Sequence, residues 1–323
     1  MRRRQAALGL VLCSLGCAQP KEPLRIAANP WPGYEVLFMA ALRGAYARAG
    51  VDVELVNVSS VGDARRSFER EQVDGMATTL VEVLSAWRRS PRRPRIVYAF
   101  DYSDGADVVL ARPGLENVAS LKGRRVGLEP ESMDALVITA ALATAGLSPR
   151  DVALVPVPQN EMPTAFRTGL IDAAPTYPPF SVQVVREGVG HPIFDSSRVP
   201  GDIIDLLAFD ARVIAERRDD VTRILLALDE TLAWMRAHPD SAASLAAARE
   251  GIQPGDYTSA LRGIRTLRLA DQAAFLASGG RVEASLARAD SAIAIGGWWS
   301  GPLPAGSRVA REPFEATQRG KPR

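Results

Sequence analysis

Short apolar runs alternate with stretches of helical periodicity along most of the chain. Residues 25–28 form an apolar run, residues 34–49 carry apolar side chains at helical spacing and end before Gly50, and residues 51–58 form a second apolar run. The alternation continues with predicted strands at 73–78 and 96–100 and with predicted helices that open near Ser60 and at Leu80. This order predicts an α/β fold with mostly parallel sheets and helices on both faces.

The pattern repeats itself once. Residues 25–30, 52–58 and 73–78 have counterparts that begin 100, 99 and 98 residues later. One match would carry little weight, but three matches in the same order predict two similar lobes. The second copy places strands at 126–128, 153–157 and 171–174 and helices at 133–145 and 162–168. Two facing lobes form a cleft, which is a preferred place for a small ligand.

Two extended segments fall outside the repeat and predict the connections between the lobes. Residues 101–111 and 200–209 each begin with a polar turn that contains glycine, and we interpret them as two crossing strands that form a hinge. The expected organisation is a first lobe of residues 24–104 and 206–315, a second lobe of residues 105–205, and a polar tail at 316–323. The first lobe then includes C-terminal helices predicted at 219–237, 242–250, 257–267 and 283–295.

The N-terminus has the pattern of an export signal. Three arginines at 2–4 precede a short apolar stretch at 6–15, and Gly16 and Cys17 follow, as at a bacterial lipoprotein cleavage site. We expect a signal peptide at 1–17, a tether at 18–23, and a lipid on Cys17 that holds the protein to a membrane in the periplasm or at the cell surface. Cleavage without lipidation stays open, because Ser14 stands where such sites usually have leucine.

Composition excludes several kinds of chemistry. The only cysteines are Cys13 and Cys17 and the only histidines are His191 and His238, so neither a disulfide nor a cysteine or histidine metal site is expected in the mature protein. The net charge of +2 does not indicate a nucleic-acid partner. No catalytic motif such as Gly-x-Ser-x-Gly or His-Glu-x-x-His is present. The expectation is a protein that is not an enzyme and has no cofactor and no metal.

Candidate ligand contacts follow from the position of the strands. Ligands of open α/β sheets bind beyond the carboxyl ends of the strands, where helix N-termini also offer free amides. Serines there can instead cap helices, and Trp31 can instead fill the core. Thr78 and Thr176 occupy the same place in both copies, whereas Asp74 and Asp172 are interpreted as structural residues before strands. The candidates are Trp31, Gly33, Tyr34, Ser59, Ser60, Thr78, Thr79 and Glu82 in the first lobe, Asp104 and Asp205 at the hinge, and Ser132, Met133, Asp134, Glu161, Thr176 and Tyr177 in the second lobe.

Five motifs resemble a known family. They are NPWPGY at 29–34, VDGMATTLVE at 73–82, DYSDGAD at 101–107, LKGRRVG at 121–127 and FDSSRVPG at 194–201. Together they resemble the substrate-binding proteins of nitrate/sulfonate/taurine-type ABC transporters. The resemblance implies a type II periplasmic-binding-protein fold and a monomer whose lobes close on a small molecule. It also implies delivery of that molecule to a permease and its ATPase.

The resemblance leaves the ligand and two other functions open. Pro178 replaces an acidic residue that relatives often carry, and the loop at 130–134 is bulkier and more acidic than usual. The loops permit an amine, a heterocycle or a small anion. The same module can present its closed form to a membrane sensor kinase. Pyrimidine-precursor synthases and some dehydratases also share this fold, although the export signal and the lack of a histidine near the cleft argue against an enzyme.

Overall fold

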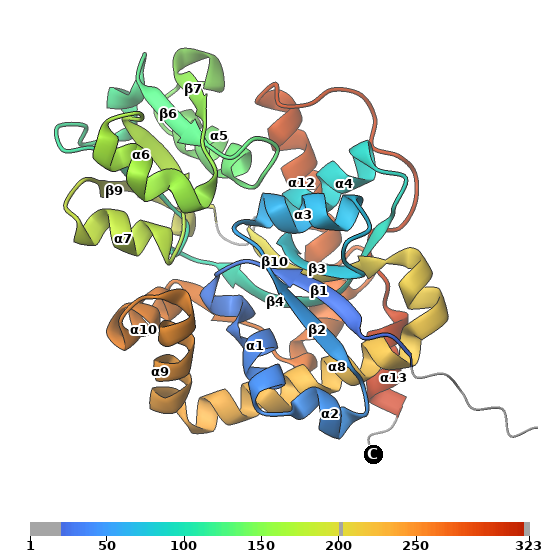
Figure 1. The fold of residues 1–323 in the computed structure, drawn as a ribbon. Helices are drawn as coiled ribbons and strands as arrows, with labels where there is room; N and C mark the ends of the chain where they lie inside the picture. The colour runs from blue at the N-terminus through green and yellow to red at the C-terminus, as the bar shows by residue number, and fades with distance from the viewer. Residues whose placement is uncertain (1–20, 200–202, 320–323) are drawn as a thin grey trace, which may run out of the picture.

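A computed structural model describes residues 21–199 and 203–319, which form two lobes built around two separate sheets (Figure 1). The signal peptide, Cys17 and residues 18–20 of the tether lie outside these residues. The six-stranded sheet of the first lobe has the order β11 (Ile264–Thr266), β4 (Pro94–Ser103), β10 (Ile204–Asp210), β3 (Gly75–Thr79), β1 (Leu24–Ala28) and β2 (Val53–Asn57). The five-stranded sheet has the order β7 (Ala153–Pro156), β6 (Arg125–Leu128), β8 (Ala173–Thr176), β5 (Val108–Ala111) and β9 (His191–Asp195).

The internal repeat is visible in both sheets. In the first, β1 lies between β2 and β3 in parallel, and in the second β6 lies between β7 and β8 in parallel. The carboxylate of Asp74 accepts a hydrogen bond from the Arg25 amide at 2.8 Å, and Asp172 accepts one from the Arg125 amide at 2.9 Å. These two aspartates therefore tie equivalent strands together, as the structural interpretation predicted.

The crossing strands make both sheets mixed. The chain leaves the first lobe between β4 and β5 and returns between β9 and β10. Strand β10 pairs antiparallel with β3 and β4, and β5 pairs antiparallel with β8 and β9. The two-lobed α/β fold is confirmed, but parallel pairing is limited to the repeated strands, because the crossing strands run in the opposite direction.

Helices cover both sheets. In the first lobe they are α1 (Glu35–Leu42), α2 (Ala45–Ala49), α3 (Val61–Glu69) and α4 (Leu80–Arg89), and in the second α5 (Asp134–Ala143), α6 (Met162–Thr168) and α7 (Phe180–Arg186). The C-terminal part adds α8 (Ala211–Ala237), α9 (Pro239–Glu250), α10 (Pro254–Arg262), α11 (Gln272–Leu276), α12 (Arg281–Ile295) and α13 (Glu312–Arg319). Short 3-10 turns are η1 (Pro32–Tyr34), η2 (Val118–Leu121), η3 (Pro149–Asp151), η4 (Gln159–Glu161), η5 (Ser196–Arg198) and η6 (Leu269–Asp271). No helix within 21–199 or 203–319 is long and apolar enough to cross a membrane.

Three predicted elements differ from the structure. The helix expected at 34–49 is interrupted because Gly44 adopts a left-handed φ of 68°. The helix expected at 257–267 ends at Arg262, and the next residues form β11, which adds an edge to the sheet beside β4. Residues 316–319 of the expected tail belong to α13, which packs on α8 and buries Phe314. The sequence pattern did not predict β11 and α13, because β11 is held by β4 and α13 by α8, which are distant in the sequence.

The C-terminal segment touches both lobes. Helix α12 packs against α4 of the first lobe and against α5 of the second (Figure 1). Beyond it, Trp298 Nε1 donates a hydrogen bond to Thr139 Oγ1 on α5 at 3.0 Å. The lobes are therefore joined by this contact as well as by the two crossing strands.

Candidate ligand-binding site

A buried cavity lies between the lobes, where the carboxyl ends of β1, β3 and β8 face one another. Its free space is only about 10 Å³, which is the size of one water molecule, so the lobes are closed on each other. Trp31 meets Tyr177 of the other lobe edge-on, with ring centroids 5.9 Å apart. The cavity is lined from the first lobe by Asn29, Trp31, Tyr34, Val61, Thr79 and Asp205, and from the second by Asp107, Met133 and Tyr177.

The turn after β1 positions the aromatic wall. Trp31 is extended, and Pro32 then starts η1 and brings Tyr34 against the hinge, where its hydroxyl donates to Asp205 Oδ1 at 2.5 Å. Gly33 is required between them, because an added Cβ would lie 1.8 Å from Asp101 Oδ2 and 2.7 Å from Trp31 Nε1. The turn therefore packs the tryptophan directly against a buried carboxyl group.

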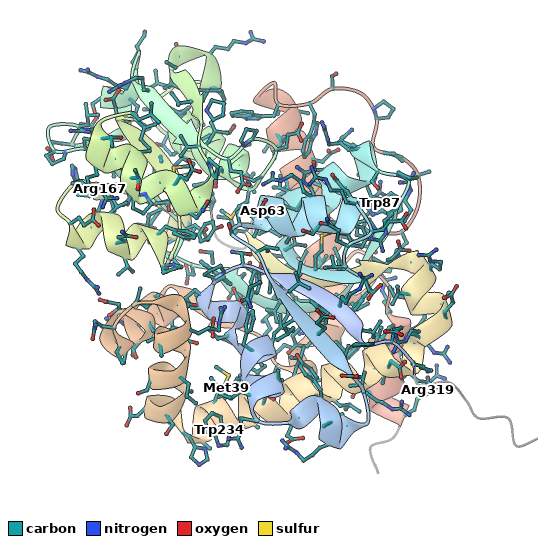
Figure 2. The ribbon with its side chains drawn as sticks, viewed as in Figure 1. Met39, Asp63, Trp87, Arg167, Trp234 and Arg319 are labelled. Atoms are coloured by element: carbon teal, nitrogen blue, oxygen red, sulfur yellow. The ribbon has the colours of Figure 1, made fainter. Side chains whose placement is uncertain are left out.

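Two glutamates of the second lobe hold the lobes together. Glu129 Oε1 accepts hydrogen bonds from Ser60 Oγ at 2.7 Å and from Arg66 Nη2 at 2.8 Å. Arg66 also binds Asp63, which Figure 2 labels on α3 at the edge that faces the second lobe. Glu131 forms ion pairs with Arg65 and Arg89. These contacts form only when the lobes are closed.

The helix starts that face the cleft already have partners. Ser60 accepts the Asp63 amide at the start of α3, and Thr79 accepts the Val81 amide at the start of α4. At the start of α5, the Met133 amide donates to Glu82 Oε1 at 2.9 Å. The nearby Glu129 amide donates to Asp134 Oδ2 at 2.7 Å. The protein's own oxygens thus occupy some of the amides that an anionic ligand would use.

Several buried polar atoms around the cavity lack a hydrogen-bond partner. Buried polar groups are normally paired, and an unpaired one costs about 1–3 kcal/mol, so such atoms point to something that binds them. Asn29 and Asp101 are fully buried, and Asp107 is 1% exposed. The unpartnered atoms are Asn29 Oδ1, Trp31 Nε1, Thr78 Oγ1, both carboxyl oxygens of Asp101, Asp107 Oδ2 and Thr176 Oγ1.

Burial shifts the acidity of the cleft carboxyl groups. It raises the pKa of Asp101 to about 7, against lowering influences from Asp205 and Trp31, and it also raises the pKa of Asp107 to about 7. Burial raises the pKa of Asp205 well above its usual range, and the charges of Asp101 and Asp107 raise it further. The pKa of Asp134 is raised in the same direction and chiefly by burial. The closed cleft therefore favours protonated carboxyl groups near neutral pH.

This shift predicts that the unliganded protein opens as the pH rises. A carboxyl group whose pKa is raised by burial contributes its full stability below its unfolded-state pKa of about 4 and loses it as the pH passes its folded-state pKa. For Asp101 and Asp107 the loss therefore begins at about pH 4 and is complete just above their folded-state pKa of about 7. We expect the radius of gyration from X-ray scattering to increase between about pH 5 and about pH 8.5, because opening lets water reach the cavity wall where Asp107 lies.

The matched control for this prediction is the double variant Asp101→Asn, Asp107→Asn. It keeps the shape of both side chains but cannot ionise, so it is expected to stay compact at both pH values. A wild-type radius of gyration that is the same at both pH values would contradict the prediction.

The structure brings most of the predicted site residues together. Trp31, Tyr34, Thr79, Met133, Tyr177 and Asp205 line the cavity. Buried around it, without lining it, are Ser60, Thr78, Glu82, Ser132, Asp134 and Thr176.

Four candidates lie elsewhere. Gly33 is behind the tryptophan, against Asp101. Ser59 and Glu161 are exposed, and Asp104 forms an ion pair with Arg265 of β11 at 2.7 Å. The side chains of Ser59, Asp104 and Glu161 do not line the cavity of this closed form and Gly33 has no side chain to place there, so a contact between these four residues and a ligand stays a prediction.

The analysis of strand ends missed three residues that line the cavity, namely Asn29, Val61 and Asp107. Asn29 directly follows β1, so the rule that ligands bind beyond the carboxyl ends of strands could have identified it. Asp107 precedes β5, and because β5 runs antiparallel to β8, its start rather than its end lies at the cleft. That direction could not be obtained from the sequence alone.

A family model described as the NMT1-like family matches residues 17–249, most of the chain. The chain belongs to the NMT1-like family. A Brucella abortus relative, named in general terms as a binding protein, is 23% identical over 262 residues, which cover 76% of this chain and 78% of the relative.

Solved structures of binding proteins share the fold of this NMT1-like chain. The alkanesulfonate-binding protein SsuA from Xanthomonas axonopodis, bound to MOPS, has a TM-score of 0.73 at 16% identity and covers 90% of this chain and 97% of its own. The periplasmic nitrate-binding protein NrtA from Synechocystis has a TM-score of 0.70 at 15% identity, with 93% and 89% covered. These likenesses confirm the periplasmic-binding-protein fold and agree with the resemblance seen in the sequence.

An enzyme shares the same fold. The desulfurization enzyme DszB, in complex with biphenyl-2-sulfinic acid, has a TM-score of 0.66 at 18% identity and covers 92% of this chain and 99% of its own. In this NMT1-like protein His191 faces Glu116, and His238 stacks on Trp234, so neither histidine lines the cavity. Among the residues that the structure describes, no three His, Cys, Asp or Glu side chains are grouped to hold a metal ion.

Proposed function

We propose that this protein is an extracytoplasmic solute-binding protein that captures a small molecule between its lobes and delivers it to an ABC importer of the nitrate/sulfonate/taurine type. One observation carries the proposal: a buried cavity, built by both lobes, is surrounded by polar atoms that the protein leaves without partners. A cleft between domains is a common place for a ligand, and because the closed form leaves room for only about one water molecule, the ligand must hold the lobes further apart. The binding proteins that share the fold support the same function.

Binding works by selecting the closed arrangement of the lobes. A ligand that touches both lobes stabilises only the closed form, so it shifts the population toward that form. We assign Trp31, Tyr34 and Thr78 to the ligand on the first lobe. On the second lobe we assign Ser132, Asp134, Thr176 and Tyr177, of which Tyr177 reaches the cavity directly.

Attachment and delivery complete the proposal. The export signal and Cys17 support a monomer that is held to a membrane by a lipid, where its closed form can meet a permease and its ATPase. We further propose that the ligand is released unchanged. The binding-protein relatives and the distance of both histidines from the cavity support this view. Turnover of a bound ligand by the purified protein would contradict it.

The proposal is tested by ligand-induced closure. The protein without its signal peptide is mixed with the low-mass fraction of a bacterial extract, and the radius of gyration is measured by X-ray scattering at about pH 8.5, where the unliganded form is expected to be open. We expect compaction for the wild type. Trp31→Ala should lose it while each lobe stays folded, because Trp31 packs across the cleft against Tyr177.

Trp234→Ala is the matched control for this experiment. Trp234 lies on α8 on the far side of the first lobe (Figure 2) and stacks on His238, so its removal should leave closure unchanged. A wild-type protein that never compacts with any low-mass fraction would overturn the proposed function. Unchanged closure in the Trp31 variant would remove Trp31 from the site.

A further inference from the structure

The chemistry of the cavity is dominated by hydrogen-bond acceptors. Asp107 and Asp205 line it, and the carboxyl group of Asp101 lies directly behind Trp31. Asn29 Oδ1 adds a fourth acceptor, since its amide nitrogen already donates to Pro30 O and to the Tyr177 hydroxyl. Apart from two threonine hydroxyls, which can donate or accept, the unpartnered buried donors in this region are Trp31 Nε1 and Arg65 Nε, and of these two only Trp31 lines the cavity.

The nearest arginines do not balance these carboxyl groups. Arg65 binds Glu69 and Glu131, and it lies close enough to Glu82 to lower the pKa of that carboxyl group. Arg66 binds Asp63 and Glu129. Both arginines therefore belong to the contacts that join the lobes. None of the residues that line the cavity is basic.

One amide at the start of each of three helices near the cavity is already taken by the protein itself. The starts of α3, α4 and α5 are occupied by Ser60, Thr79 and Glu82 respectively. An anionic group would find no basic side chain in the lining and would face carboxyl groups that ionise near neutral pH, which is unfavourable in a buried site. A cation with N–H groups has a better match, because its N–H groups can meet the unpartnered oxygens of Asn29 and Asp107.

We propose that the ligand of this site is a small organic cation with its own N–H donors, an ammonium or an amidinium group, which binds Asp107, Asp205 and Asn29 beside the rings of Trp31 and Tyr177 and holds the lobes further apart than they are in this closed form. The inference rests on the proposed function and names the class of solute that this function would serve. The two rings can add cation–π attraction from both lobes. The carboxyl groups give the positive charge a partner that the rest of the cavity does not provide.

Charge balance predicts how affinity depends on pH. Asp101 faces Asp205 and Trp31 and senses the charge of Asp107, while Asp107 faces Ser103 and senses the charge of Glu82. A cation replaces protons on these groups, so its affinity is expected to rise about tenfold or more from about pH 5.5 to about pH 8. The affinity of an anion would change in the opposite direction.

The test uses pairs of probes with the same body and opposite charge. They are benzamidine against benzenesulfonate, and butylamine against butanesulfonate, each at about 10 mM, with melting temperature and calorimetric affinity as readouts. Tetramethylammonium tests the need for N–H donors, because it carries charge alone. We expect both N–H cations to raise the melting temperature, tetramethylammonium to raise it less, and the sulfonates to leave it unchanged.

Two variants locate the effect. Asp107→Asn should weaken the binding of the N–H cations about tenfold or more, and Asp205→Asn gives an independent second variant should the first fold poorly. Asp104→Asn is the control, because Asp104 pairs with Arg265 outside the cavity, and it should bind as the wild type does.

Each outcome separates this inference from the proposed function. The proposed ligand class is overturned if the sulfonates raise the melting temperature. It is also overturned if no cation raises it while the low-mass extract still closes the protein. Both outcomes leave solute binding itself intact. Cation binding that is unchanged in both cavity variants overturns the assignment of these carboxyl groups. Failure of the extract to close the protein overturns the proposed function itself.

Discussion

Gly33→Ala is expected to lower the free energy of unfolding by about 1–3 kcal/mol, which is the usual cost of forcing an extra carbon into a packed site. The new Cβ would lie 1.8 Å from Asp101 Oδ2 and 2.7 Å from Trp31 Nε1. Asp101 belongs to β4 of the same lobe and is fully buried, so opening the lobes gives no relief. The melting temperature should fall by about 2–4 °C for each kcal/mol, with or without ligand.

Gly255→Ala is the matched control for that measurement. Gly255 lies in α10, has no atom within 4 Å of an added Cβ, and has no left-handed φ. Alanine should therefore be neutral there or slightly stabilising, because it favours the helix. Equal melting temperatures for the wild type and Gly33→Ala would contradict the contact between this turn and Asp101.

Gly62→Ala is expected to prevent closure without destabilising the open protein. Gly62 lies in α3, where alanine favours the helix by up to about 1 kcal/mol. In the closed form, however, the added Cβ would lie 2.3 Å from Glu129 Oε1 of the other lobe. Glu129 is 2% exposed and is held by Ser60 and Arg66, so it cannot move aside without losing those bonds. Ligand-induced compaction should need about tenfold more ligand or more, equal to at least about 1.4 kcal/mol.

A double variant separates this effect from a local change in the helix. Glu129→Asp shortens the opposing side chain, so adding it to Gly62→Ala should restore part of the closure that Gly62→Ala loses. Gly62→Ala should meanwhile keep the melting temperature of the unliganded wild type at about pH 8.5, where the open form is expected. Normal closure by the single variant, or no rescue by the double variant, would contradict a contact between Gly62 and Glu129 in the closed form.

The two glycines show where sequence reasoning stops. Gly33 was selected because it follows a strand, and Gly62 was not selected, although it lies near the start of a predicted helix. The structure gives each a specific neighbour, Asp101 within the lobe and Glu129 across the cleft. These neighbours are 68 and 67 positions away in the chain, and no local pattern contains that information.

Two aspartates near the hinge show the same limit of the sequence. Asp101 and Asp104 are three positions apart in the predicted hinge, and only Asp104 was selected as a candidate ligand contact. Asp101 is fully buried near the cavity, whereas Asp104 pairs with Arg265 on the outside. The difference comes from β11, a short edge strand that was predicted as helix and that places Arg265 beside Asp104.

The sequence by itself determined the repeated strands and helices, the two-lobed α/β fold, and the structural role of Asp74 and Asp172. These features depend on the spacing of apolar residues and on the residues at strand ends. Both are patterns among residues that are close together in the sequence. Only the tertiary structure decided the direction of the crossing strands, the place of Asp107 at the cleft, and the imbalance of carboxyl groups over cations there. Burial and pairing arise between residues far apart in sequence, and they alone set which charged groups share a cavity and which are neutralised elsewhere.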